Sequence, residues 1–278
     1  MDIEVCIVTY GNTETIERAI SSCNLIPGSV GIALHDNCPT ESSIEAARDA
    51  AGQMPFRYEV CDENCGFARG CNSLAFSSDA LSILFLNPDA AICKWPSDQD
   101  QEALPRDSII GLDVEHSKRG HWGIEREIWD EVGMRWFRAI PPRPVGRGYV
   151  SGAAMLVSQH VFRALNGFDP RFFMYYEDID FCLRAGIAGF EVYGCTALEV
   201  SHIGGYSAKR EDFGVTPKRS YCSAKYFHEK WGHSMAGWRA FNTFDALGRS
   251  IFYATVRRDQ PISCEWWFLT KELASKRI

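Results

Sequence analysis

Alternating strands and helices, polar strand ends and an ordinary globular composition together predict an α/β fold, in which a sheet is flanked by helices and followed by a C-terminal helical extension. In residues 1–91, short runs rich in β-branched residues alternate with helix-like segments, joined by short connections. This alternation is typical of parallel strands joined by right-handed crossovers. The 278 residues are 46% hydrophobic and 23% charged, as in globular chains that bury a sizeable core.

The elements of the first half follow from periodicity and from turn residues. Residues 3–10 predict a buried strand because they are mostly apolar or β-branched. Asn12 and Thr13 predict the cap of a helix that ends near residue 23. Further strands are expected at residues 30–35, 56–60 and 81–86, and further helices at about residues 42–51 and 67–78.

Polar residues end four successive strands of this predicted sheet. In parallel α/β sheets, ligands bind beyond the carboxyl ends of the strands. The same residue types also end strands for local reasons alone, so one such position has both interpretations. Four in succession favour a ligand site. They are Thr9-Tyr10, Asp36-Asn37, Glu63-Asn64 and Asn87-Asp89.

The middle of the chain is less regular. Residues 92–107 are polar and contain prolines, which predicts a loop, and residues 108–114 predict a strand. Residues 115–147 show no clear pattern. Trp122, Trp129 and Trp136 recur every seven residues, which indicates either a helical face or chance. Core packing is the default explanation for these tryptophans, and stacking on a sugar is the alternative.

The second half predicts more strands and helices. Residues 149–157 predict a strand that contains small residues at 151–154, where a ligand or a neighbouring backbone can approach closely. Short strands are also expected at residues 190–194 and 197–201. Helices are expected at residues 159–165, 217–231 and 235–258.

Charge and motifs exclude several function classes. The net charge of −7 argues against broad nucleic-acid binding, which needs a basic surface. The chain lacks a G-x-G-x-x-G segment after its first strand and lacks G-x-x-x-x-G-K-[ST]. Nicotinamide-dependent redox chemistry and P-loop chemistry therefore lose support.

The eleven cysteines are scattered and show no C-x-x-C spacing. Cys61, Cys65 and Cys71 are the closest group, and their gaps do not match a zinc site. Free thiols in a reducing cytoplasm are therefore expected. A signal peptide is not expected, because the chain enters a strand pattern at once, and no apolar run approaches the about 18–20 residues that span a bilayer.

Residues 167–184 bring an aromatic run next to an acidic cluster at the start of a predicted helix. A carboxylate beside bulky rings is a natural general base. The alternative is that these carboxylates only complement the helix dipole. Asp180 lies about 200° around the helix from Asp178 and is expected to point elsewhere, as a helix-start anion or as the partner of Arg184.

These motifs together resemble the inverting glycosyltransferases of family 2, especially the rhamnosyltransferase-like branch. The resemblance rests on Thr-Tyr and Asp-Asn strand ends, an Asn-x-Gly-Phe-Ala segment, Leu-Asn-Pro-Asp-Ala and the acidic stretch, at residues 9–10, 36–37, 64–68, 86–90 and 167–184. It covers about residues 1–210. The segment at residues 70–74 departs from the family's usual Asn pair and keeps only Asn72.

The resemblance implies a GT-A fold, a Rossmann-like nucleotide-binding mixed sheet. The catalytic domain would occupy residues 1–210, with a nucleotide-binding half at 1–91, a variable insert at 92–148 and an acceptor and catalytic half at 149–210. Residues 211–278 would form the helical extension.

The resemblance also implies roles for individual residues. The donor-binding residues carried over are Thr9, Tyr10, Asp36, Asn37, Asn64, Gly66, Phe67, Asn72 and Asn87. Asp89 would hold a divalent metal, Mn²⁺ or Mg²⁺, with His202 as a second ligand. Asp178 would be the catalytic base, and Glu177 would bind acceptor or position the loop.

Four cations near the end of this region have two interpretations. Lys209, Arg210, Lys218 and Arg219 either neutralise donor phosphates or are solvated surface charges.

The implied activity is an inverting, metal-dependent hexosyltransferase in surface polysaccharide synthesis. It would use a nucleotide-sugar donor, with dTDP-rhamnose as the best match, and a saccharide or lipid-linked saccharide acceptor. A UDP-sugar transferase for GlcNAc, GalNAc or galactose is one alternative, and a non-catalytic binding module is another. We expect a cytoplasmic protein without a nucleic-acid partner. If the acceptor is lipid-linked, the aromatic and basic tail would give peripheral contact with the inner membrane face; the alternative is that the tail packs on its own domain.

Overall fold

The computed structural model describes residues 2–11, 13–61, 63–96, 107–116, 120–122, 149–203, 215–233, 235–258 and 260–275. The chain forms two compact units. The sheet unit comprises Met1–Phe173 and Glu177–Ser207, and the helical unit comprises Met174–Tyr176 and Ala208–Ile278. The predicted domain boundary at residue 210 lies outside the described residues and stays a prediction.

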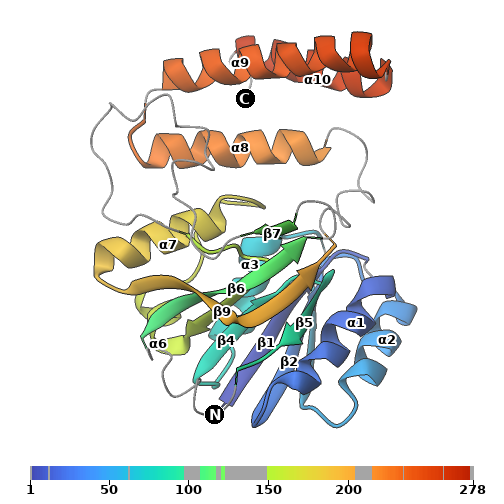
Figure 1. The fold of residues 1–278 in the computed structure, drawn as a ribbon, viewed down its shortest axis with the longest axis vertical. Coiled ribbons are helices and arrows are strands. Elements are labelled where there is room, and N and C mark those ends of the chain that lie inside the picture. Colours follow the sequence, from blue (N-terminus) through green and yellow to red (C-terminus); the bar gives the residue numbers. More distant parts are fainter. Residues whose placement is uncertain are drawn as a thin grey trace. The chain divides into compact units, whose positions relative to one another are not determined.

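A mixed sheet of nine strands, counted over the described residues, forms the centre of the sheet unit (Figure 1). The strands run in the order β3-β2-β1-β4-β8-β6-β9-β5, and β7 pairs with β6. Strands β1 to β4 pair in parallel, as do β6 and β9, whereas β5, β7 and β8 run antiparallel to their neighbours. The bounds are β1 Asp2–Thr9, β2 Ser29–Asp36, β3 Phe56–Val60, β4 Ser82–Leu86, β5 Ala90–Lys94, β6 Ser108–His116, β7 Gly120–Trp122, β8 Ala154–Ser158 and β9 Glu191–His202. The predicted α/β class with a mixed sheet is confirmed.

Aliphatic side chains form the core on one face of this sheet. Ile3, Val5 and Ile7 alternate along β1, are at most 2% exposed, and pack with Ile16 and Ile20 of the first helix. Burying each such side chain stabilises the fold by about 1.5–3 kcal/mol. The elements that cover this face are α1 Thr13–Ser22, η1 Cys23–Leu25 and α2 Glu41–Ala51 (Figure 1).

An aromatic core lies on the other face. The ring of Phe85 in β4 lies 5.4 Å from that of Phe162 and 5.0 Å from that of Phe168, and Phe181 lies 4.9 Å from Phe168. All four rings are fully buried, and such aromatic pairs add about 0.5–1.5 kcal/mol each. The helices on this side are α3 Phe67–Phe76, α6 Gln159–Ala164 and α7 Glu177–Ala188. Phe181 of α7 and Phe85 of β4 both belong to this cluster, which therefore holds α7 on the sheet.

The helical unit contains α8 Val215–Lys230, α9 Met235–Phe252, the π-helical turn η4 Tyr253–Arg257 and α10 Gln260–Ala274. Helices α9 and α10 are joined by a reciprocal pair of buried hydrogen bonds. Ser250 Oγ donates to the Ser263 carbonyl at 2.9 Å, and Ser263 Oγ donates to the Ser250 carbonyl at 2.9 Å. Large apolar side chains stay exposed on this unit, including Phe244 at 73% and Val256 at 67%.

Several expected element bounds were wrong. Strand β5 extends to Lys94 and so overlaps the start of the loop predicted at residues 92–107, because the run from Ala90 to Lys94 pairs with β9. The strand predicted at residues 149–157 begins only at Ala154, because backbone groups before it form hydrogen bonds elsewhere instead of with a neighbouring strand. The two short strands predicted at residues 190–201 form one strand, β9, whose pairing with β6 shifts register between Leu112 and Asp113.

Two other expectations concern helices. Trp122 ends strand β7, so a helical face that includes it is excluded, while residues 129 and 136 lie outside the described residues. The last turn of the helix predicted at residues 235–258 is the π-helical turn η4 instead. A π-turn is a local widening that such a long helix tolerates.

Candidate active site

The predicted donor residues gather at one edge of the sheet because the strands that carry them are parallel. Thr9 and Asp36 end β1 and β2 as direct register partners. The Asn37 backbone N–H donates to the Thr9 carbonyl at 2.9 Å. Asn87 follows β4, which is parallel to β1, so it comes to the same edge. Tyr10 continues β1 at this edge and is partly exposed.

The Asp36 carboxylate is completely buried and already carries three donors. Its Oδ1 accepts from the Cys38 backbone N–H at 3.0 Å, and its Oδ2 accepts from Ser43 Oγ at 3.0 Å and Tyr58 Oη at 3.2 Å. Burial, followed by the nearby Asp36 charge, raises the pKa of Tyr58, so the phenol stays protonated and donates. Asp36 is thus held rigidly by the fold at the position predicted to meet the base.

The loop before α3 brings Asn64, Gly66 and Phe67 to this edge. Asn37 Oδ1 accepts from the Cys65 backbone N–H at 2.9 Å, and Asn64 Oδ1 accepts from the Gly66 N–H at 3.0 Å. The Phe67 N–H donates to the Phe173 carbonyl at 2.8 Å. The amides of Asn37 and Asn64 therefore shape the turn into α3.

Gly66 permits this turn for two reasons. Its φ of +83° lies in the region that favours glycine. A Cβ at this position would overlap the carbonyl oxygen of Phe173 and lie 2.9 Å from the Cδ2 of that ring. The backbone of residue 173 thus approaches the start of α3 more closely than a side chain would allow.

Asn72 has a different placement from the other predicted donor residues. Its Nδ2 donates to the Phe168 carbonyl at 2.8 Å, and its Oδ1 accepts from the Phe168 N–H at 2.9 Å. Both amide atoms thus bind backbone 96 residues away in sequence. This geometry favours a positioning role for Asn72, which holds the segment that leads to the acidic stretch.

The two predicted metal ligands lie side by side. Asp89 Oδ1 lies 3.0 Å from His202 Nε2, and Asn87 Nδ2 lies 3.3 Å from the same ring nitrogen. Asp89 and His202 are 8% and 9% exposed. The Ile203 N–H donates to the Asp89 carbonyl at 3.1 Å, which joins the end of β9 to the turn between β4 and β5. A carboxylate oxygen and an imidazole nitrogen suit Mn²⁺ or Mg²⁺ as partial ligands.

The Asp178 carboxylate is fixed at the start of α7 by two backbone donors. Its Oδ2 accepts from the Gly152 N–H at 2.9 Å, and its Oδ1 accepts from the Ile179 N–H at 2.8 Å. The next carbonyl in that loop, Ala153, accepts from the Asn87 N–H at 2.9 Å. Residues 152 and 153 therefore link the predicted base to the predicted metal end, which is why the strand β8 begins later than expected. Asp178 itself is partly exposed.

Glu177 differs from its neighbour. Its side chain is 5% exposed, and its Oε2 is buried without a hydrogen-bond partner among the described residues. Burial, followed by the Asp178 charge, raises the pKa of Glu177 well above its usual value. Burial thus favours the protonated form of Glu177, whereas the Asp178 side chain is partly exposed.

Asp180 turns away from these two carboxylates, as predicted. It is fully buried, and Arg184 Nε donates to its Oδ2 at 2.8 Å. The same guanidinium donates to the Leu165 and Gly167 carbonyls at 2.6 and 2.8 Å. This pair holds α7 against the end of α6.

Of the four predicted phosphate-neutralising cations, Lys209 and Arg210 lie outside the described residues. Lys218 Nζ lies 3.2 Å from Glu272 Oε2 within the helical unit. Because that pair is intramolecular, it favours the surface-charge interpretation for Lys218. Arg219 has contacts within the protein and is partly exposed.

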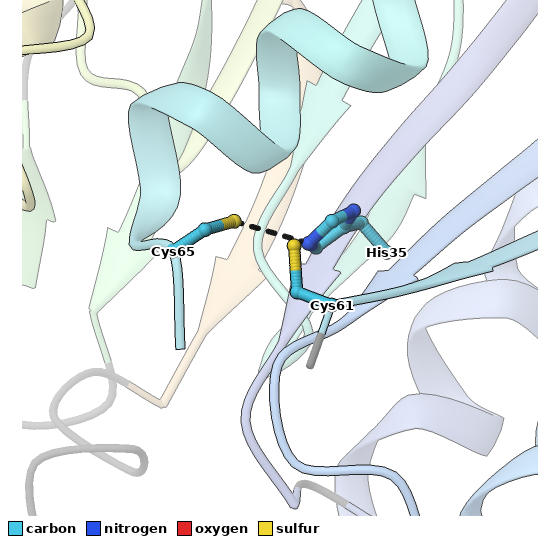
Figure 2. Close-up of side chains that lie close together, drawn as sticks. All are labelled: His35, Cys61 and Cys65. Atoms are coloured by element: carbon cyan, nitrogen blue, oxygen red, sulfur yellow. Dashed lines mark hydrogen bonds between the residues drawn. The ribbon is translucent and has the colours of Figure 1, made fainter. Parts of the chain in front are cut away.

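Sequence reasoning missed one group at this edge. His35, Cys61 and Cys65 come from the end of β2, the end of β3 and the turn into α3, and their ligating atoms lie within 4.8 Å of one another (Figure 2). All eleven cysteines are free thiols, as predicted. The expectation that these cysteine gaps do not match a zinc site overlooked that the C-x₃-C spacing of Cys61 and Cys65 lies within the usual range, and a comparison of cysteine gaps could not include a histidine 26 residues earlier.

None of the described helices has a stretch that is long and apolar enough to span a membrane.

Comparison with curated proteins finds distant relatives. The chain is 26% identical over 224 residues to a low-salt glycan biosynthesis hexosyltransferase of Haloferax volcanii, covering 72% of this chain and 67% of the relative. It is 26% identical over 185 residues to an N-acetylglucosaminyl-diphospho-decaprenol L-rhamnosyltransferase of Mycobacterium tuberculosis, covering 65% of this chain and only 56% of that protein. No protein-family model matches the chain.

Solved structures share the fold at low identity. The complex of S. aureus TarS residues 1–349 with UDP has a TM-score of 0.55 at 10% identity, covering 99% of this chain and 92% of that one. The Pyrobaculum calidifontis mannosyltransferase with GDP-Man and Mn²⁺ has a TM-score of 0.55 at 12% identity, covering 99% and 88%. These matches confirm the predicted GT-A arrangement of the sheet and its flanking helices.

Proposed function

We propose that this chain, a hexosyltransferase of the rhamnosyltransferase-like branch of glycosyltransferase family 2, transfers rhamnose from dTDP-rhamnose with inversion. The acceptor would be a saccharide or a lipid-linked saccharide in surface polysaccharide synthesis. The names of the two distant relatives, one of them an L-rhamnosyltransferase for N-acetylglucosaminyl-diphospho-decaprenol, support this choice.

The observation that carries the proposal is the meeting of Asp89 and His202. They are 113 residues apart in sequence, and their side chains lie 3.0 Å apart at the carboxyl edge of the sheet. A hydrogen bond between Asn87 and the same imidazole extends the group. A buried carboxylate beside an imidazole, next to the predicted nucleotide residues, has the composition of a site for a divalent ion that also binds phosphates.

Asp178 would take the proton from the acceptor hydroxyl as that oxygen attacks the anomeric carbon. The new C–O bond forms as the bond to the nucleoside diphosphate breaks, and the proton moves to the Asp178 carboxylate. Two backbone donors, from Gly152 and Ile179, hold the two oxygens of this carboxylate in place at the start of α7. Since Glu177 is buried and its pKa is raised, it would shape the site rather than take this proton.

Asp89 and His202 would hold Mn²⁺ or Mg²⁺. A bound divalent ion supplies Lewis-acid stabilisation of the charge on the departing diphosphate. One carboxylate suffices when phosphate oxygens complete the ion's shell. Mn²⁺ in the mannosyltransferase complex is consistent with this assignment for the fold.

The donor base would lie between the ends of β1 and β2 and the turn into α3. Thr9, Asp36 and Asn64 would contact the base and ribose. TarS binds UDP, so a UDP-sugar donor is the second candidate.

The helical unit would contact the membrane that carries a lipid-linked acceptor. Helices α9 and α10 expose Phe244, Trp267 and Phe268 at 73%, 46% and 58%, and Lys271 Nζ lies 5.1 Å from the Trp267 ring centre. Aromatic side chains with nearby cations suit the headgroup region. Co-sedimentation of the protein with anionic and with neutral vesicles tests this membrane contact. We expect Trp267→Ala and Phe268→Ala to reduce binding to the two kinds of vesicle equally.

A donor panel tests the main proposal. The purified protein is melted with dTDP-rhamnose, UDP-sugars and GDP-sugars, each with and without Mn²⁺. Binding to the folded state raises the melting temperature, with about 2.7 kcal/mol of stabilisation at 100 times the Kd. We expect a shift with dTDP-rhamnose that requires Mn²⁺. A shift with UDP-sugars alone would select the second candidate, and no shift with any donor would favour a non-catalytic module.

A further inference from the structure

We propose that His35, Cys61 and Cys65 form a binding site for Zn²⁺ or a similar thiophilic ion, separate from the Asp89–His202 pair. The site would use His35 Nε2 and the two cysteine sulfur atoms, with a fourth ligand from solvent. Two thiolates and one imidazole form a ligand set that zinc adopts in proteins when one position stays open.

The geometry is close to that of a bound ion. Cys65 Sγ lies 3.2 Å from His35 Nε2, and all three ligating atoms lie within 4.8 Å of one another. In a tetrahedral zinc site, an S and an N ligand lie about 3.6 Å apart and two sulfurs about 3.8 Å apart, from the usual Zn–S and Zn–N lengths. Figure 2 shows both sulfurs beside the same edge of the imidazole ring. Small rotations of the cysteine side chains would complete the site.

The chain positions these ligands on rigid elements. His35 is 2% exposed and lies in β2, while Cys61 directly follows β3, the parallel neighbour of β2. Cys65 is held by its backbone N–H, which donates to Asn37 Oδ1 at 2.9 Å. The two cysteines are four residues apart and partly exposed, so an ion can reach them from solvent. Their spacing falls within the C-x₂₋₄-C range of zinc sites.

The second ring nitrogen of His35, Nδ1, has the surroundings of the outer nitrogen of a metal-bound histidine. Nδ1 is buried, makes no hydrogen bond of ordinary length among the described residues, and lies 4.0 Å from Glu59 Oε2. Glu59 is held by Ser73 Oγ at 2.6 Å and by Arg57. A carboxylate behind the imidazole is the usual outer partner of a zinc-bound histidine and fixes its tautomer.

The His35 imidazole and the Cys65 thiol have pKa values that are shifted in opposite directions. Burial lowers the pKa of His35, which keeps the imidazole neutral and able to ligate. Burial, followed by Cys61, raises the pKa of Cys65 to about 12, so the ion would displace thiol protons into solvent. A bound cation makes that deprotonation favourable.

One consequence rests on the proposed function. His35 precedes Asp36, and the Cys65 N–H binds Asn37, so an ion here would rigidify the predicted base-binding edge. Tighter donor binding in the zinc-loaded protein is then expected. Loss of metal binding and loss of donor binding are measured separately, so failure of one proposal is distinguishable from failure of the other.

Cobalt titration of the reduced, metal-free full chain tests the site directly. Co²⁺ is a spectroscopic substitute for Zn²⁺, and we expect thiolate charge-transfer and tetrahedral absorption bands that saturate at one equivalent and vanish on addition of Zn²⁺. Cys61→Ser and Cys65→Ser are each expected to weaken binding more than about 100-fold, and Glu59→Gln by about 10- to 100-fold.

Cys38→Ser and Glu63→Gln are matched controls, because Cys38 is an exposed thiol, Glu63 is an exposed carboxylate between Cys61 and Cys65 in sequence, and neither belongs to the cluster. Both should bind cobalt as the wild type does. Near-UV circular dichroism and melting curves separate lost ligands from lost folding. The proposal is overturned if the reduced wild type gives no thiolate band, or if the band survives in both cysteine variants.

Discussion

Two histidine-containing groups stand at the same edge of the sheet and differ in their donor atoms. At the end of β9, His202 meets the carboxylate of Asp89 and the amide of Asn87. At the end of β2, His35 meets the thiols of Cys61 and Cys65. Oxygen ligands suit Mg²⁺ and Mn²⁺, whereas thiolates suit Zn²⁺. Under the two proposals, strand ends at one edge of a sheet would select different ions through side-chain chemistry alone.

The largest effect is expected when the group of Asp89, Asn87 and His202 is disrupted. Asp89→Ala removes the one carboxylate ligand predicted for the donor metal, so transfer should fall by about 10²- to 10⁴-fold, several kcal/mol of lost charge stabilisation. Mn²⁺-dependent donor binding should disappear in the same variant, measured by calorimetry. His160→Ala, on the exposed side of α6, is the control. Unchanged Mn²⁺-dependent donor binding in Asp89→Ala would contradict the assignment of Asp89 as a metal ligand. Loss of cobalt binding at the histidine–cysteine cluster in the same variant would show that the two histidine-containing groups are not independent.

The next effect disturbs the turn that carries Cys65. Gly66→Ala combines an unfavourable φ with overlap against Phe173, and should cost about 2–5 kcal/mol of unfolding free energy. Gly52→Ala is the matched control, since its φ is +56° but no other atom lies within 4 Å of the added Cβ. Urea denaturation should show a loss of about 1 kcal/mol or somewhat more for the control. Equal losses of unfolding free energy in the two variants would mean that the close approach of residue 173 adds nothing to the cost of the alanine at position 66.

The smallest effect concerns a third histidine-containing group, in which two imidazoles lie next to each other. In the helical unit, His228 Nδ1 lies 2.8 Å from His233 Nδ1, and His228 is 1% exposed. Burial, followed by the His233 neighbour, lowers the pKa of His228 to about 3. Because the unfolded state binds the proton more readily, stability should fall as pH drops from about 6.5 towards 3.

The His228 contribution should reach about 2 kcal/mol at pH 5 relative to pH 7.5. The difference between wild type and His228→Leu in denaturant unfolding at both pH values isolates this contribution from other titrating groups. If both proteins lose equal stability on acidification, His228 is not the residue that must remain neutral.

Much of the sheet was predictable, because its first half is regular. The strand at Phe56–Val60 and the start of the helix at Phe67 match the sequence prediction, since β-branched runs and glycine turns have local causes. Strand β5 was not predictable in the same way, because five residues pair at the sheet edge with β9, more than a hundred residues later. The late start of β8 has a similar cause, since Gly152 donates to Asp178 rather than to a neighbouring strand.

The candidate site was predictable where residue types carry the chemistry. The family motifs indicated Asp89 and His202, and the structure brings them together, although their roles as ligands stay a proposal. The positions of Asn72 and Glu177 depended on tertiary contacts, namely the Phe168 backbone and a buried environment, that no local pattern reports. The cluster of His35 with two cysteines was missed for the same reason, since parallel pairing of β2 and β3 is what joins its members.

The most direct test of the account is transfer by Asp178→Asn, measured beside donor affinity in the same preparation. Asparagine keeps the size of the side chain but cannot take a proton, so transfer should fall by about 10²- to 10⁴-fold. Mn²⁺-dependent donor binding should stay within about twofold of wild type, since a base acts on the acceptor. Asp49→Asn, an exposed carboxylate on α2, should change neither quantity. Full transfer activity in Asp178→Asn would contradict the assignment of Asp178 as the base.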